Sequence, residues 1–250
     1  MIKGTYTNTK FDGNLIYKNV SPDSGAEKYI FETLSKDVDI NEYIAKISHF
    51  VELPEICEYE NNVVKQNIIE GKNVDEYLME ADINDDKVVT LYRSLVQIYK
   101  NIKQDDSLTL DFNLFNFIVK DEENLVFVDV TPPLFTEKIE QLDDRFMSQR
   151  ELFLNKPLQL TSFSMYFMMP FIIRDTKKED LDELYTKMLG VISEEDLIDD
   201  YNQSYDHIFS TRRDLFETYL NENVENFKED FLSFDIKNDL NTLGEELCQM

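Results

Sequence analysis

Three polar side chains flank a predicted β-hairpin in the middle of the chain. The segment LTLDFNLFNFIVKDEENLVFVDVTPPLF, residues 108–135, holds two apolar stretches separated by a charged, turn-like run. Asp111 and Asn116 belong to the first stretch, and Asp129 ends the second. A carboxylate can accept a proton from a hydroxyl group, and carboxylate and amide oxygens are preferred ligands of Mg²⁺. The spacing alone leaves open whether the hairpin holds these groups against a ligand or whether they are chance polar residues in an acidic chain.

Hydrophobic periodicity predicts the elements that would position these residues in the N-terminal part. They are strands at 2–7 and 14–20, helices within 21–36 and 40–50, and a hairpin at 55–69. Asp12-Gly13 is a turn signal between the first two strands. Asn61-Asn62 predicts the turn of the later hairpin, because asparagine tolerates a positive φ.

After about residue 70 the pattern changes to helices that surround the central hairpin. A short helix is predicted near 74–78, a long one from Asp86 to Ile102, and mostly helices from 136 to 250. The stretch MYFMMPFII, residues 165–173, is typical of a buried segment, since methionine and aromatic stripes usually form core. The acidic run from Ser193 to Asp200 is interpreted as a capped, solvated helix start; a carboxylate wall for an amino-bearing substrate is the alternative.

Composition excludes several classes of protein. With 250 residues, of which 42% are hydrophobic and 30% charged, the chain can bury a sizeable core and fits a soluble globular protein. A net charge of −26 argues against nucleic acid or an anionic membrane as a partner. The absence of a long apolar run and of a signal-peptide pattern predicts a cytoplasmic protein. Two cysteines and two histidines make a disulfide framework or a thiolate or imidazole metal site improbable.

The pattern Asp111-Phe-Asn-Leu-Phe-Asn116, followed by Asp129, resembles the catalytic core of the kinase fold in its aminoglycoside phosphotransferase and choline kinase-like branch. There a loop reading roughly His-Gly-Asp-x-x-x-x-Asn leads into a hairpin that ends on an aspartate. The resemblance implies that Asp111 is the catalytic base and that Asn116 and Asp129 bind Mg²⁺. Such residues suit phosphoryl transfer, which needs positioning and charge neutralisation more than covalent chemistry.

Upstream segments extend the resemblance to the nucleotide site. Residues 51–78 resemble the strand, turn, strand and linker that join the two lobes, which implies that the backbone of Asn67, Ile68 and Ile69 binds adenine. Gln66 would then occupy the gatekeeper position. The strand LIYKNV resembles the one that carries the phosphate-binding lysine, here Lys18. The ion-pair partner of that lysine would be Glu27, with Glu32 as the second choice.

The chain also departs from the family pattern. Thr109-Leu110 stands where the family has His-Gly, and Asp129 is followed by Val-Thr-Pro-Pro, which stiffens the segment and argues against a mobile activation loop. The N-terminal stretch GTYTNTKFDG is a poor match to a glycine-rich phosphate loop. These departures keep open a catalytically silent pseudokinase that binds a ligand or a protein.

The resulting expectation is an α+β, bilobal, protein-kinase-like fold with a β-rich N-lobe at 1–69 and a mostly helical C-lobe at 70–250. The expected function is transfer of phosphate from ATP or GTP, with Mg²⁺, to a hydroxyl group of a small molecule. A cationic, amino-bearing acceptor would suit the acidic chain.

Overall fold

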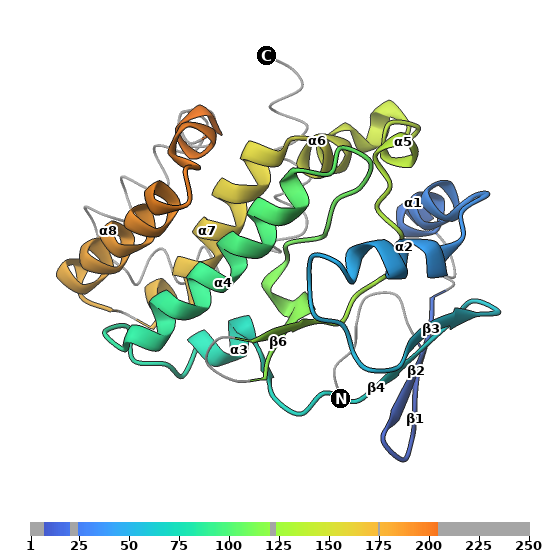
Figure 1. Ribbon diagram of the computed structural model, residues 1–250, viewed down its shortest axis with the longest axis horizontal. Helices are drawn as coiled ribbons and strands as arrows, with labels where there is room; N and C mark the ends of the chain where they lie inside the picture. Colours follow the sequence, from blue (N-terminus) through green and yellow to red (C-terminus); the bar gives the residue numbers. More distant parts are fainter. Residues whose placement is uncertain (1–7, 21–24, 121–123, 175, 205–250) are drawn as a thin grey trace.

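The computed structural model describes residues 8–20, 25–120, 124–174 and 176–204, which form a mixed α+β structure. Figure 1 shows the strands β1 to β4 at one end, the long helices α4, α7 and α8 towards the other, and β6 between them. The α+β class is confirmed. The predicted strand at 2–7 and the predicted helices beyond residue 204 lie outside the described residues.

A four-stranded antiparallel sheet forms the N-terminal part, with strand order β1-β2-β4-β3. Its strands are β1 (Asn8–Asp12), β2 (Leu15–Asn19), β3 (Cys57–Glu60) and β4 (Val63–Asn67). Both predicted turns are confirmed: Gly13 has a φ of 59°, and Asn61 and Asn62 have φ values of 52° and 62°. Such left-handed positions favour glycine and asparagine over other residues.

Two helices connect β2 to β3 and lie between the sheet and the helical body (Figure 1). They are α1 (Gly25–Ser35) and α2 (Ile40–Ile47). The Asp39 side chain caps α2 by accepting from the backbone N–H of Asn41. The apolar face of α2 is buried and includes Tyr43. This face places the Tyr43 side chain against the central part of the chain.

Residues 68–71 lead from β4 into a second sheet of order β5-β6-β7. Its strands are β5 (Lys72–Asn73), β6 (Phe117–Val119) and β7 (Leu125–Phe127). Gly71 has a φ of 148°, and a Cβ added there would lie 2.5 Å from the carbonyl oxygen of Val119. Glycine is therefore required where the connecting segment meets β6.

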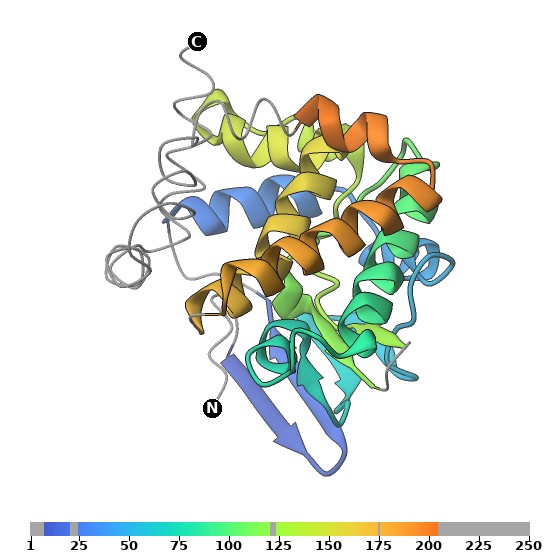
Figure 2. The same ribbon diagram turned by 90° about the vertical axis from the view of Figure 1, so that its left-hand side faces the viewer.

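The remaining helices pack around an aromatic core. They are α3 (Val74–Leu78), α4 (Asp86–Lys103), α5 (Thr136–Ile139), α6 (Met147–Leu154), α7 (Lys156–Ile173) and α8 (Lys178–Glu194), and a further helical segment covers residues 198–204. Figures 1 and 2 show α4, α7 and α8 side by side. Tyr92 and Tyr99 of α4 contact Phe163 of α7, which confirms that the methionine- and aromatic-rich helix α7 is core. None of the described helices combines the length and the apolar character needed to cross a membrane.

The acidic run near residue 195 lies where one helix ends and the next begins. α8 stops at Glu194, Asp196 turns the chain with a φ of 61°, and a further helix begins at residue 198, so the predicted helix start is confirmed. Ion pairs join this run to cations of α4, namely Arg93–Glu194, Lys100–Glu195 and Lys103–Asp200. The carboxylates that sequence alone leaves solvated therefore hold α8 and the following turn against α4.

Candidate functional site

Lys18 joins the N-terminal sheet to the end of β7. Side chains alternate across a strand, so Lys18 of β2 lies on the same face as the buried residues Val64 and Gln66 of β4. Its ammonium donates a hydrogen bond of 2.8 Å to the carbonyl oxygen of Val128. With its amide suitably oriented, Gln66 donates to the same carbonyl and accepts from Lys18, both at 3.2 Å. Lys18 and Gln66 therefore meet the residue immediately before Asp129.

Burial shifts the ionisation of Lys18 and Asp129 in opposite directions. Desolvation lowers the pKa of Lys18 and is opposed first by the negative charge of Asp129. Desolvation raises the pKa of Asp129 and is opposed by Lys18 and by a backbone hydrogen bond from Thr131. Each charge stabilises the other, but burial favours the neutral form of both groups. A cation beside Asp129 or an anion beside Lys18 would offset this penalty.

Local hydrogen bonds shape the loop that carries Asp111. The Asp111 carboxylate accepts from the backbone N–H of Asn113 at 3.0 Å, and the Asn113 side chain accepts from that of Phe115 at 3.2 Å. The buried Asn116 donates its amide N–H to the Asp111 carbonyl at 3.3 Å. These short-range bonds explain the polar residues in an otherwise apolar stretch.

The hairpin brings Asn116 and Asp129 to one end of the small sheet. Phe117 pairs with Phe127, and the backbone N–H of Val128 donates to the Asn116 carbonyl at 2.9 Å. The charges of Asp111 and Asp129 both raise the pKa of Tyr43, although burial of that hydroxyl is the largest cause. The Asn116 amide bonds the Asp111 carbonyl, and the Asn116 carbonyl bonds the residue before Asp129, so these contacts bring the three residues predicted from the hairpin into one region.

The predicted nucleobase-binding segment leaves two backbone groups without a partner among the described residues. Ile68 donates to the Asn14 carbonyl at 3.0 Å, and Asn67 donates to the Ile56 carbonyl at 3.1 Å. The return bond from the N–H of Ile56 goes to the Asn67 side chain, at 2.6 Å. Within the part of the chain that is described, the Asn67 carbonyl and the Ile69 N–H thus carry no hydrogen bond. In a regular antiparallel ladder the N–H of Ile56 would donate to the Asn67 carbonyl.

The two glutamates predicted as partners of Lys18 both belong to α1. Glu27 lies on α1, but its side chain is outside the described part of the structure. Glu32 is exposed and forms an ion pair with Lys28 of the same helix, at 3.8 Å. The second choice was therefore wrong: Glu32 pairs along its own helix.

The segment after Asp129 is fastened at several points. The peptide bond between Thr131 and Pro132 is cis, and the Leu134 carbonyl accepts from the N–H of Thr109 at 2.9 Å. Further along, Phe146 stacks on Tyr29 of α1 with ring centroids 5.0 Å apart.

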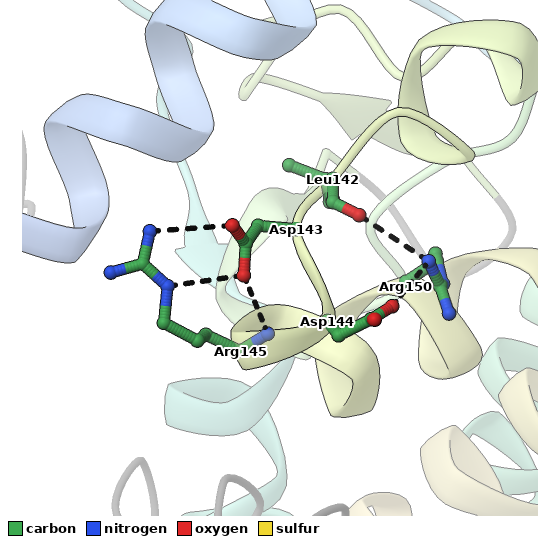
Figure 3. A network of polar contacts seen from close by, with 5 residues as sticks. All are labelled: Leu142, Asp143, Asp144, Arg145 and Arg150. Atoms are coloured by element: carbon green, nitrogen blue, oxygen red, sulfur yellow. Dashed lines mark hydrogen bonds and ion pairs between the residues drawn. The ribbon is translucent and has the colours of Figure 1, made fainter.

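Charged side chains brace the turn that carries Phe146. Figure 3 shows Arg145 bound to Asp143 and Arg150 reaching the Leu142 carbonyl and Asp144. The Nε of Arg145 lies 3.0 Å from an Asp143 carboxylate oxygen. These contacts connect the turn to the start of α6 and present Phe146 to α1.

A polar hollow of about 440 Å³ is lined by α2, by residues 106 and 107 and by α5, and not by Lys18 or Asp129. Most of its titratable lining residues are acidic, among them Asp39, Asp106 and Glu137, with Lys46 as a cation. Nowhere in the described residues do three or more His, Cys, Asp or Glu side chains gather as a metal site. A Mg²⁺ site built from Asn116, Asp129, water and phosphate oxygens would not be of that type.

Sequence reasoning did not identify three residues that hold the Asp111 loop. Tyr43 donates to the Thr109 carbonyl, Gln159 bonds the Thr109 hydroxyl, and Lys156 donates to three carbonyls of the same connection. Their helical positions were predictable, but no sequence signal indicates their distant partners. Comparison of the chain with protein-family models, with curated proteins and with solved structures gives no match.

Proposed function

We propose that the protein is a kinase-like phosphotransferase that moves the terminal phosphate of a nucleotide, with Mg²⁺, to a hydroxyl group of a small molecule. The observation that carries the proposal is the contact of Lys18 with the Val128–Asp129 segment, 2.8 Å from Nζ to the Val128 carbonyl oxygen. A lysine of β2 thus reaches the segment that carries the Asp129 carboxylate, as a site for phosphate and metal would need. The division into an N-lobe at 1–69 and a C-lobe at 70–250 belongs to this proposal.

The order of the elements supports the same proposal. A sheet of order β1-β2-β4-β3, helices between β2 and β3, a connecting segment, helices and a hairpin follow one another as the kinase resemblance requires. The Asn67 carbonyl and the Ile69 N–H would bind the edge of the nucleobase. The Asn67 side chain accepts the hydrogen bond from the N–H of Ile56, and this leaves the Asn67 carbonyl able to accept one from the nucleobase.

The chain's own residues would divide the work as follows. Lys18 would exchange the Val128 carbonyl for phosphate oxygens, and the amide oxygen of Asn116 and the carboxylate of Asp129 would hold Mg²⁺, which neutralises phosphate charge when bound. Asp111 would orient the acceptor hydroxyl and take its proton. A bond forms between the acceptor oxygen and the terminal phosphorus, the bond to the bridging oxygen breaks, and the nucleoside diphosphate leaves with that electron pair.

A catalytically silent binding protein is the second candidate. Thr109-Leu110 in place of His-Gly favours it, as do the present partners of Lys18, which are a carbonyl and an amide besides Asp129. Such a protein could bind nucleotide without turnover. The two candidates differ in whether Asp111 affects any reaction.

Turnover with labelled ATP and a panel of amino sugars, aminocyclitols and amino alcohols tests the proposal. Wild type should transfer phosphate to at least one acceptor, and Asp111→Asn should lower kcat by about 100-fold or more. Asp106→Asn, which removes an exposed carboxylate near the same loop, is the matched control and should retain activity. If wild type binds nucleotide yet transfers no phosphate, even slowly to water, the silent candidate replaces the enzyme.

A further inference from the structure

Thr109, close before Asp111, is held by groups from three separate parts of the fold. Its side chain is 1% exposed, and its backbone N–H donates to the Leu134 carbonyl at 2.9 Å. Its carbonyl accepts from the Tyr43 hydroxyl of α2 at 2.9 Å. Its hydroxyl exchanges hydrogen bonds with the Gln159 amide of α7, at 2.9 and 3.1 Å. Every polar group of this residue is therefore fixed by a distant element.

Helix α7 fixes the backbone on both sides of Thr109. Gln159 also contacts the Leu110 carbonyl at 3.4 Å, and the Lys156 ammonium donates to the carbonyls of Ile102, Asp105 and Leu108 at 3.1, 2.6 and 3.3 Å. Figure 1 shows the connection from α4 to β6 running between α7 and α2. The two helices hold opposite sides of the chain that delivers Asp111.

Tyr43 is the link from α2. Its side chain is 1% exposed and packs edge-on against Phe135, with ring centroids 5.5 Å apart. The negative charges of both Asp111 and Asp129 reach its hydroxyl, which nevertheless donates to the Thr109 carbonyl. The ring fills core space, while the hydroxyl bonds the Thr109 carbonyl. Replacing the hydroxyl alone should therefore loosen the loop without opening a cavity.

We propose that Tyr43 and Gln159 are positioning residues that hold the Asp111 loop through Thr109 and tie it to α2. The inference rests on the proposed function. A displacement of about 1 Å at a reacting group can cost about 100-fold in rate, so loss of either bond should appear in turnover before it appears in nucleotide affinity.

The test measures kcat and the KM for ATP of Tyr43→Phe, using phosphate transfer or slow hydrolysis in which water replaces the acceptor. We expect kcat to fall by about 10- to 100-fold while the KM for ATP changes by less than about 3-fold. Tyr92→Phe is the matched control. The Tyr92 hydroxyl is also buried, but it bonds Ser164 at 2.6 Å and not the loop that carries Asp111. This variant should lose a similar amount of thermal stability and keep kcat within about 2-fold.

A second pair of variants covers the case in which Tyr43→Phe folds poorly. Thr109→Val removes the hydroxyl that bonds Gln159 and should lower kcat, whereas Thr109→Ser keeps the hydroxyl and should retain most of it. Equal kcat for Tyr43→Phe and Tyr92→Phe, or for the valine and serine variants, overturns the positioning role alone. Absence of any turnover in a wild-type protein that is folded overturns the proposed function and this inference together.

Discussion

Removal of the Lys18 ammonium should reveal the cost of burying the Asp129 carboxylate. In Lys18→Met the apolar stem is retained, but the 2.8 Å bond to the Val128 carbonyl and the positive charge beside Asp129 are lost. A hydrogen bond from a charged group contributes about 1.5–3 kcal/mol, and breaking a fully buried ion pair costs about 3–5 kcal/mol. Because both side chains remain partly exposed, we expect a loss of about 2–3 kcal/mol. That loss corresponds to a fall in Tm of roughly 5–10 °C.

A double-mutant cycle identifies the source of the loss. Asp129→Asn removes the buried carboxylate but leaves the Lys18 ammonium without the negative charge that opposes its desolvation, so it should also destabilise the fold on its own. In the Lys18→Met background it should recover about 1–2 kcal/mol, because no unpaired carboxylate remains. Urea unfolding of the four proteins, followed by circular dichroism, gives the coupling free energy.

The loss should also depend on pH. Without Lys18, the folded-state pKa of Asp129 rises further above its ordinary value of 3.8. Folding then favours the protonated carboxyl, so its contribution is fully present below a pH of about 4 and is lost as the pH rises through the folded-state pKa. The deficit of Lys18→Met relative to wild type should be smallest in acid, where only the hydrogen bond to the Val128 carbonyl is missing, and should grow towards neutral pH. Additive effects within about 0.5 kcal/mol, or a deficit independent of pH, would refute the coupling of Lys18 to Asp129.

Three further predictions concern stability and can be checked by thermal unfolding. Gly71→Ala should destabilise the fold by about 3 kcal/mol or more, because its Cβ would meet the Val119 carbonyl. Gly190→Ala, in open space on α8, should instead stabilise the fold by about 0.5–1 kcal/mol. Equal effects of the two substitutions would contradict the assigned backbone geometry. Lys156→Met should cost about 2–4 kcal/mol, since three carbonyls lose one donor, and a neutral result would show that water replaces it. Glu195→Gln should destabilise the fold by under about 1 kcal/mol at low salt. Because its lysine partner lowers the pKa of Glu195, this loss should vanish as the pH falls below about 4. A loss of stability that persists in acid would contradict the ion pair.

Local pattern predicted the elements that carry the site. The Asn61-Asn62 turn, the long helix beginning at Asp86 and the central hairpin all follow from residue types whose conformational preferences act over a few positions. Asp111 and Asn116 could be identified as candidate site residues because they have the spacing of the resembled motif and lie next to that hairpin. Signals of this kind operate within one element or between adjacent ones.

Contacts between distant elements could not be predicted in the same way. The bond from Tyr43 to Thr109 depends on how α2 packs against the α4–β6 connection, and neither local sequence specifies it. The acids near Glu195 were interpreted as solvated because their cationic partners on α4 lie far away in sequence. The same limit explains the error at Glu32, whose neighbour on the helix surface is Lys28.

The most direct test of the account is thermal unfolding with and without millimolar Mg²⁺–ATP, in wild type, Asp129→Asn and Asp75→Asn. Asp75 of α3 is the control, since desolvation also raises its pKa but it is not among the proposed nucleotide or metal ligands. A ligand that binds only the folded state stabilises it by about 2.7 kcal/mol at a concentration of 100 times Kd, and so raises the unfolding midpoint. The account predicts a magnesium-dependent rise in wild type and Asp75→Asn that is lost in Asp129→Asn. No rise in wild type, or an equal rise in all three proteins, would contradict a nucleotide–metal site at Asp129.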